Sequence, residues 1–185
     1  ASTGQAMLDH PGFDKLAFTG STEVGYDVAK AAANRLIPAT LELGGKSANI
    51  YFDDCQIDKA IEGAQIGILF NQGQVCCAGS RIFVQEGIYD EFVAKLVEAF
   101  KAVKVGDPMD MQTQMGWVET AKKEGATVLV GGEAAKIPGF EDGAFMQPTL
   151  LGNVTNDMAV AQNEIFGPVA VVIKFRTEEE VVAMA

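Results

Sequence analysis

Short apolar runs alternate with amphipathic segments along most of this chain of 185 residues. The runs are rich in β-branched and aromatic residues, as strands are, whereas the amphipathic segments repeat apolar residues at the helical period. Strands that alternate with helices predict an α/β fold with a largely parallel sheet. The expected strands are 15–20, 39–43, 47–52, 81–85, 126–130, 145–151 and 169–175, and the expected helices are 22–35, 57–70, 88–103, 117–124 and 177–185.

Helical spacing also predicts which side chains of the first two helices are buried. Loops are expected at 105–115 and in the glycine-rich stretch 131–143. The side chains expected to share a buried face are Val24, Val28, Ala31 and Ala32 in 22–35, and Ile61, Ala64, Ile68 and Leu69 in 57–70.

The net charge of -11 comes from acidic and basic residues that are interspersed along the chain. Nucleic-acid binding needs a positive patch, so we expect no nucleic acid partner. No apolar run reaches the length that spans a bilayer, so we expect no membrane association. Three cysteines without a CxxC pair favour a reduced, cytoplasmic setting. With a single histidine, His10, a histidine-based metal site is hard to build, and we expect no metal.

The stretch FTGSTEVG at 18–25 has the pattern of a strand, a glycine turn and a helix. Gly20 permits a tight turn, and Ser21 or Thr22 can cap the helix. The free N–H groups of a helix N-terminus suit a phosphate. The spacing from Gly20 to Gly25 is not the GxGxxG of the common dinucleotide fingerprint. From these residues alone, a phosphate site and a plain strand-to-helix turn both remain open.

The stretch LELGGKS at 41–47 places one acid, Glu42, between apolar neighbours at the end of a strand. Desolvation there would raise the pKa of the carboxyl group, which could then act as a general base. The alternative is an edge glutamate that faces water.

The stretch FNQGQVCCAGSR at 70–81 contains two adjacent cysteines, Cys76 and Cys77. A thiol in a polar, glycine-rich turn after a helix can be exposed enough to react. Free cysteines are also common as small buried residues. We keep that structural interpretation for the third cysteine, Cys55.

The stretch NEIFGPV at 163–169 combines an acid, an aromatic residue and Gly-Pro. It predicts a rigid loop that presents Glu164 and Phe166. The alternative is a plain connection into the strand 169–175.

In this order, the four motifs resemble those of the aldehyde dehydrogenase superfamily, and the resemblance covers nearly the whole chain. It implies an aldehyde-dehydrogenase-like α/β fold: the end of a Rossmann-type cofactor domain, followed by an α/β catalytic domain with a largely parallel sheet. Residues 1–43 would be the C-terminal part of the NAD(P)-binding domain, and 44–185 the nucleophile-bearing catalytic domain.

The resemblance also implies the roles of individual residues. In the GQxC pattern Cys76 is the nucleophile and Cys77 a packing neighbour, and Glu42 in LELGGK is the general base. The implied cofactor-binding residues are Gly20 and Ser21 at the pyrophosphate, Gly25 for close helix packing, Leu43, Glu164 at the nicotinamide-side ribose and Phe166 beside it.

The implied reaction is oxidation of an aldehyde to a carboxylic acid with NAD, or with NADP. Cys76 would form a thiohemiacetal and then a thioester, which a water activated by Glu42 would hydrolyse. A homodimer or homotetramer is implied for the full-length protein.

The chain departs from the family in length, since members carry an N-terminal half and a C-terminal continuation that are absent here. The helix at 177–185 stops in mid-pattern, and Trp117 directly after Gly116 resembles a join between distant points. These features predict a truncated chain with an internal gap near 116–117. An inactive fragment, or a structural or binding use of the fold, is the alternative to an active enzyme.

Overall fold

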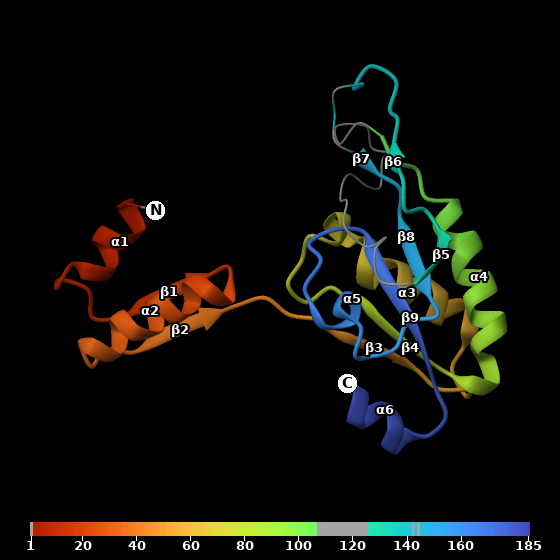
Figure 1. The fold of residues 1–185 in the computed structure, drawn as a ribbon, viewed down its shortest axis with the longest axis horizontal. Coiled ribbons are helices and arrows are strands. Elements are labelled where there is room, and N and C mark those ends of the chain that lie inside the picture. The colour runs from red at the N-terminus through yellow and green to blue at the C-terminus, as the bar shows by residue number, and fades with distance from the viewer. Residues whose placement is uncertain (1, 107–125, 142, 144) are drawn as a thin grey trace. The chain divides into compact units, whose positions relative to one another are not determined.

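The structure is a computed structural model that describes residues 2–106, 126–141, 143 and 145–185 (Figure 1). The chain forms two compact units, Ala1–Gly44 and Gly45–Ala185. The expected helix 117–124 and the expected join at 116–117 lie outside the described residues.

The N-terminal unit consists of α1 (Ser2–Asp9), β1 (Leu16–Thr19), α2 (Thr22–Asn34) and β2 (Ala39–Glu42). The two strands pair in parallel, and Leu16, Val28 and Ala32 form the core between them and α2. The face predicted for α2 is confirmed at Val28 and Ala32. The prediction is wrong for Val24, which is 42% exposed, because Gly25 occupies the adjacent buried position.

Helix α1 was not predicted, because it has no buried residue and therefore no apolar stripe that a pattern could reveal.

The C-terminal unit is built on a five-stranded sheet in the order β3-β4-β9-β8-β5. The first four strands run parallel and β5 is antiparallel to β8, so the predicted α/β fold with a largely parallel sheet is confirmed. In chain order the strands are β3 (Ala48–Tyr51), β4 (Arg81–Gln85), β5 (Thr127–Val130), β8 (Thr149–Gly152) and β9 (Val169–Phe175).

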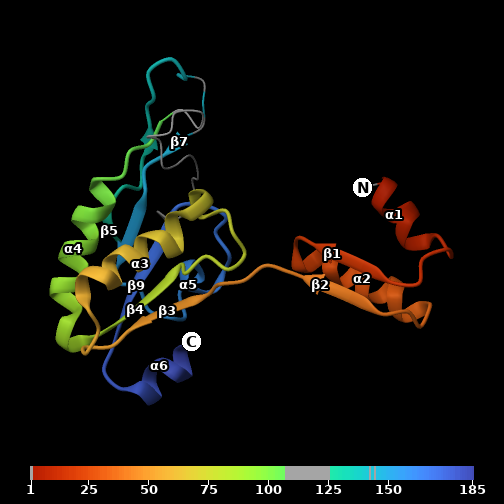
Figure 2. The same cartoon turned by 180° about the vertical axis from the view of Figure 1, so that it is seen from behind.

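Helices cover both faces of this sheet (Figures 1 and 2). On one face α3 (Ile57–Leu69) and α4 (Tyr89–Lys101) pack on alternate residues of β4 and β9, such as Ile82 and Val172. On the other face, Phe83 and Val171 pack with α5 (Ala159–Gln162) and α6 (Glu178–Met184). The burial predicted for Ile61, Ala64, Ile68 and Leu69 is confirmed.

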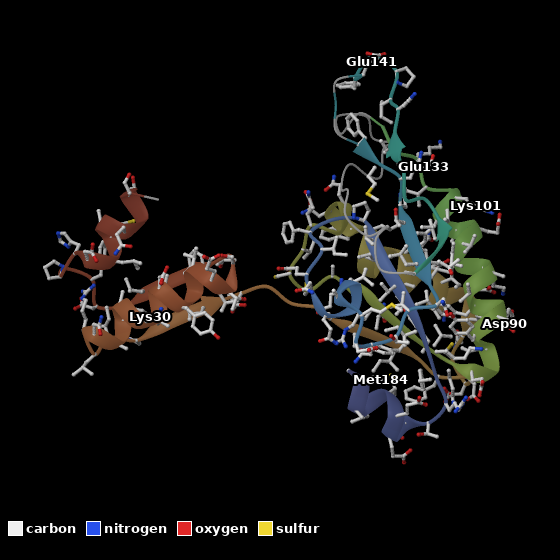
Figure 3. All side chains as sticks on the ribbon, viewed as in Figure 1. Lys30, Asp90, Lys101, Glu133, Glu141 and Met184 are labelled. Carbon is white, nitrogen blue, oxygen red and sulfur yellow. The ribbon has the colours of Figure 1, made fainter. Side chains whose placement is uncertain are left out.

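The outer face of α4 is polar. Its Asp90 and Lys101 side chains are exposed and lie on the side away from the sheet (Figure 3). This two-sided character accounts for the strong periodicity of that segment.

Two predictions about the middle of the unit are wrong. The expected strand 145–151 is two strands, β7 (Phe145–Met146) and β8, because Pro148 between them has no N–H for a sheet ladder. The expected loop 131–143 contains β6 (Ala134–Ala135), which pairs with β7 in a separate two-stranded sheet.

Short helical turns extend the ends of the longer elements. A 3₁₀ turn, η1 (Phe70–Gly73), follows α3, and another, η2 (Glu86–Ile88), precedes α4. Across the described residues, none of the helices combines the length and the apolar character that crossing a bilayer demands.

Candidate active site

The loop that carries Cys76 begins with a left-handed turn. After α3, Asn71, Gln72 and Gly73 have φ values of 48°, 60° and 68°. The Asn71 side chain donates a hydrogen bond to the Gln74 carbonyl oxygen at 3.1 Å. Two consecutive non-glycine residues in this conformation are strained, so the surrounding contacts must hold the turn in place.

Cys76 follows Gly73 by three residues, and its side chain is exposed. At the far end of the loop, the Gly79 N–H donates to the Gly67 carbonyl of α3 at 2.8 Å. Both ends of the loop are therefore attached to α3, and the thiol is presented to solvent between them.

Gly73 joins this loop to the one that carries Glu164. A side-chain carbon at Gly73 would lie 2.2 Å from the Gly167 carbonyl oxygen, which is far inside van der Waals contact. Only glycine fits a positive φ with a backbone this close. The FNQGQVCC and NEIFGP motifs, about 90 residues apart in sequence, thus lie side by side.

Gly45 brings a third motif to the same place. A side-chain carbon at Gly45 would lie 2.9 Å from the Cys76 carbonyl oxygen. The Gly45 N–H donates to Glu164 Oε1 at 3.4 Å, a long hydrogen bond. The end of LELGGKS, the Cys76 loop and the Glu164 loop therefore meet within the C-terminal unit.

Glu164 and Phe166 are both presented to solvent from their loop. Phe166 is 52% exposed, and the Glu164 side chain is also exposed. Directly behind them Gly167 and Pro168 are buried, and the Thr149 N–H donates to the Pro168 carbonyl at 2.8 Å. The loop thus presents the Glu164 carboxylate, which is a hydrogen-bond acceptor, and the Phe166 ring. The end of the loop at Pro168 is attached to the sheet by a hydrogen bond.

Lys46, which follows Gly45 in the sequence, is partly buried. Its side-chain nitrogen is sealed from solvent and has no hydrogen-bond partner among the described residues. Burial and then repulsion from Arg81 lower the pKa of Lys46 to about 8, and Glu164 opposes the shift. The sequence alone could not have revealed this residue, because lysine is normally an exposed side chain.

The expected residues of the N-terminal unit cluster at the start of α2. The Ser21 Oγ caps the helix by accepting a hydrogen bond from the Val24 N–H at 3.4 Å. A side-chain carbon at Gly25 would lie 2.6 Å from a methyl group of Leu43, so Gly25 allows the close packing expected of it. The Gly20 N–H donates to the Glu42 carbonyl at 3.0 Å.

Glu42 ends β2 with its side chain exposed. Leu41 and Leu43 do not bury the Glu42 side chain within the N-terminal unit, because alternate residues of an extended chain face opposite sides. Glu42 belongs to the N-terminal unit and Cys76 to the C-terminal unit.

The other two cysteines differ from each other. Cys77 is exposed, so the expectation that it packs against neighbours is wrong. Cys55 is partly buried, and desolvation, followed by repulsion from Asp54, raises its pKa. A raised pKa keeps a thiol protonated and unreactive, which agrees with a structural role for Cys55.

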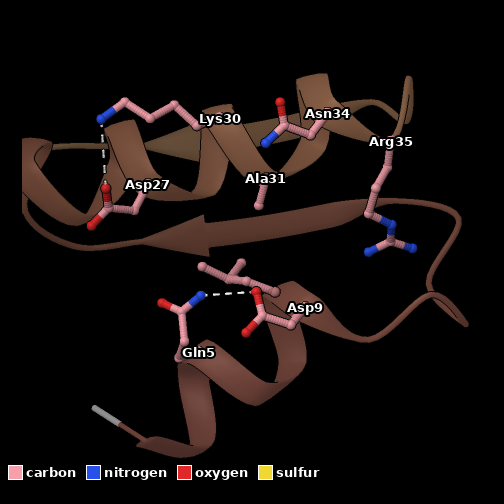
Figure 4. A pocket seen from close by; sticks show the side chains of 8 residues that line it. Gln5, Asp9, Asp27, Lys30, Ala31, Asn34 and Arg35 are labelled. Carbon is pink, nitrogen blue, oxygen red and sulfur yellow. Dashed lines mark hydrogen bonds and ion pairs between the residues drawn. The ribbon is translucent and has the colours of Figure 1, made fainter.

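A polar pocket of about 480 Å³ lies between α1 and α2, within the N-terminal unit (Figure 4). Gln5 donates to Asp9 at 2.9 Å on one wall, and Lys30 pairs with Asp27 at 3.8 Å on the other. None of the expected site residues lines it, so we do not place the chemistry there.

Comparison with known proteins identifies the family. The model of the aldehyde dehydrogenase family matches residues 1–185. An aldehyde dehydrogenase from Emericella nidulans is 48% identical over 195 residues, which covers 98% of this chain and 38% of that protein. The chain therefore spans well under half of the length of this relative.

Solved structures give the same result. An NAD+ complex of an aldehyde dehydrogenase from Bacillus cereus is 42% identical, with a TM-score of 0.88 over 98% of this chain and 39% of that one. A betaine aldehyde dehydrogenase from Staphylococcus aureus in complex with NAD+ is 40% identical, with a TM-score of 0.92 over 100% of this chain and 39% of that one. The chain belongs to the aldehyde dehydrogenase family.

Proposed function

We propose that the protein carrying this chain oxidises an aldehyde to a carboxylic acid with NAD+, NADP+ being the alternative dinucleotide. The observation that carries the proposal is the meeting of Gly45, Cys76 and Glu164 in one place, with the thiol exposed. An exposed thiol beside a carboxylate that can accept hydrogen bonds from ribose hydroxyls is an arrangement that suits this oxidation.

Cys76 begins the reaction. Its thiolate adds to the aldehyde carbon, so a C–S bond forms and the carbonyl oxygen becomes an oxyanion. Backbone N–H groups of the loop around Cys76 would stabilise that oxyanion. Loss of a hydride from the same carbon then leaves a thioester on Cys76.

The side chains present fit a dinucleotide. Ser21 caps a helix whose N-terminus, beside Gly20, suits a pyrophosphate. The exposed Glu164 carboxylate can accept hydrogen bonds from ribose hydroxyls, and the exposed Phe166 ring can lie beside the nicotinamide end. When bound, NAD+ supplies the hydride acceptor.

Glu42 completes the cycle in this proposal. Its carboxylate takes a proton from a water molecule, whose oxygen attacks the thioester carbon. The carbon–sulfur bond breaks, the acid is released and Cys76 returns as a thiolate.

The test is NADH formation by the full-length gene product with a small aliphatic aldehyde. We expect turnover in the wild type and none in Cys76→Ser. Glu42→Gln should release a burst of NADH close to one per site and then stop, because the thioester is not hydrolysed. Full turnover in Cys76→Ser would refute the proposed nucleophile.

The second candidate is a fragment without turnover, and the 38% coverage of its relative motivates it. An intact mass of 19.6 kDa combined with no NADH formation would support that candidate.

A further inference from the structure

Cys77 follows the proposed nucleophile directly, and the proposed reaction does not use it. The side chains of Cys76 and Cys77 are both exposed, and both thiols are free. Exposed thiols are the ones that oxidants reach, and a neighbouring thiol changes the product that oxidation gives.

The two cysteines form the corner of a tight turn. The Ala78 N–H donates to the Val75 carbonyl oxygen at 3.0 Å, so Cys76 and Cys77 are the two central residues of a four-residue turn. Val75 and Ala78 on either side are partly buried. The part of the turn that solvent reaches most easily is therefore the pair of cysteines.

The turn is attached to ordered structure directly behind this corner. The Gly79 N–H donates to the Gly67 carbonyl oxygen of α3 at 2.8 Å, and Gly79 and Ser80 are buried. Ser80 leads into the interior strand β4. A covalent change at the corner can therefore stay local, because the chain returns to fixed contacts within two residues.

The covalent chain keeps the two thiols within reach of each other. Consecutive Cα atoms are about 3.8 Å apart across the trans peptide bond that joins Cys76 to Cys77. Ordinary disulfides join Cα atoms roughly 4.4–6.8 Å apart, so a bond between neighbours closes a small, strained ring. Strained and exposed disulfides are easily reduced, and a disulfide here would therefore be a reversible modification.

Cys55 differs from this pair in position and in reactivity. It precedes α3 and is partly buried, and desolvation, followed by repulsion from Asp54, raises its pKa. A protonated, partly buried thiol reacts slowly. We therefore expect Cys77, and not Cys55, to respond to a change at Cys76.

We propose that Cys77 is a resolving thiol for Cys76, and that the pair is a site of reversible oxidation by hydroperoxides. The Cys76 thiolate attacks one peroxide oxygen and the O–O bond breaks. Cys76 becomes a sulfenic acid, and the other oxygen takes up a proton and leaves as an alcohol, or as water from hydrogen peroxide. The Cys77 sulfur then attacks the sulfenic sulfur. An S–S bond forms, and the sulfenic hydroxyl leaves with the Cys77 proton as water.

The sequence of steps is balanced, because two thiols lose two electrons and one peroxide gains them. It also protects Cys76, since a sulfenic acid without a resolving thiol is oxidised further to a sulfinic acid, which thiol reductants do not restore. Formation of the disulfide is independent of the proposed function. The loss of NADH formation that accompanies it rests on the proposed function, because it assumes that Cys76 is the nucleophile.

The experiment follows one tryptic peptide of the full-length gene product. Trypsin releases residues 60–81, with Cys76 and Cys77, as one peptide and places Cys55 in another, 47–59. The protein is treated with hydrogen peroxide at neutral pH, the remaining thiols are alkylated with iodoacetamide, and the digest is analysed by mass spectrometry without reduction. NADH formation is measured on the same samples before and after dithiothreitol.

In the wild type we expect peptide 60–81 to escape alkylation and to weigh about 2 Da less than its dithiol form, because two hydrogens are lost. Dithiothreitol should restore both thiols and the activity. In Cys77→Ser the same peptide should gain about 32 Da, as a sulfinic acid does, and neither the thiol nor the activity should return. Cys55→Ser is the matched control and should behave as the wild type.

A wild-type peptide with an oxidised Cys76 and an alkylated Cys77 would overturn the proposal, and this result needs no variant. So would a disulfide from 60–81 to another peptide, or full recovery of Cys77→Ser at a peroxide dose that oxidises the wild-type pair completely. If the disulfide forms but the untreated protein makes no NADH, the proposed function fails and the oxidation site remains, so the two failures can be distinguished.

Discussion

Replacing Lys46 with methionine should make the protein more stable at neutral pH. The pKa of Lys46 falls from 10.5 to about 8 on folding. At about 1.4 kcal/mol per pKa unit, the charged form destabilises the folded state by about 3 kcal/mol. Part of the Lys46 side chain still contacts solvent, so we reduce this value to about 1–2 kcal/mol. Methionine keeps the apolar stem and removes the charge.

The gain should depend on pH with a definite sign. The folded-state pKa is below the unfolded-state pKa, so the penalty is fully present below about pH 8 and disappears as the pH rises to about 10.5. Lys46→Met should therefore raise the melting temperature by a few degrees at pH 7, and the gain should vanish near pH 10.5.

The assay is thermal unfolding of the full-length gene product, followed by circular dichroism at both pH values. The difference between the two pH values isolates the charge, because any change in packing is common to both. Lys59→Met, at an exposed position, provides the control. An equal gain at both pH values, or a loss at pH 7, would refute the reasoning.

Three further outcomes follow from the loops of the site. Iodoacetamide at neutral pH should label the exposed Cys76 well before the partly buried Cys55, as peptide mass mapping would show; equal rates would contradict an accessible nucleophile. Gly73→Ala should destabilise by about 3 kcal/mol in thermal unfolding, because it adds a backbone collision to a positive φ. Gly139→Ala, with a φ of 85° and open space around it, should be milder, and similar losses at both glycines would argue against the collision. Arg81→Met should lower stability by about 3 kcal/mol in thermal unfolding, because the side chain donates hydrogen bonds to the carbonyl oxygens of Lys46 and Met184 in the part-buried interior. An unchanged melting temperature would show that these hydrogen bonds contribute nothing to stability.

The strands that could be predicted best are the ones buried on both faces. The observed bounds of β4 and β9 equal the predicted 81–85 and 169–175, since a central parallel strand is a continuous apolar run between turn residues. The prediction was wrong at 145–151, where Pro148 divides two strands that join different sheets. Apolar pattern alone does not show which sheet a short strand joins.

For the site, the motifs made Cys76 and Glu164 candidates, and the structure presents both side chains to solvent from loops, while their roles stay a prediction from the family resemblance. The contacts of Gly45 and Gly73 depend on how distant loops pack, so the sequence could not supply them. The same is true of Lys46, whose burial comes from tertiary structure. The exposure of Glu42 was likewise not decided by its apolar neighbours, because alternate residues of a strand face opposite sides.

The pairing of β4 with β9 has a consequence for how this protein is made. Arg81 pairs with Val171, about 90 residues later in the chain, so the centre of the sheet cannot close until β9 has left the ribosome. Until then, β4, which is rich in apolar residues, has no partner strand along the edge that later pairs with β9. We therefore expect nascent chains that stall before β9 to aggregate or to bind chaperones. Synthesis speed through this interval, more than final stability, would then set the yield of folded protein.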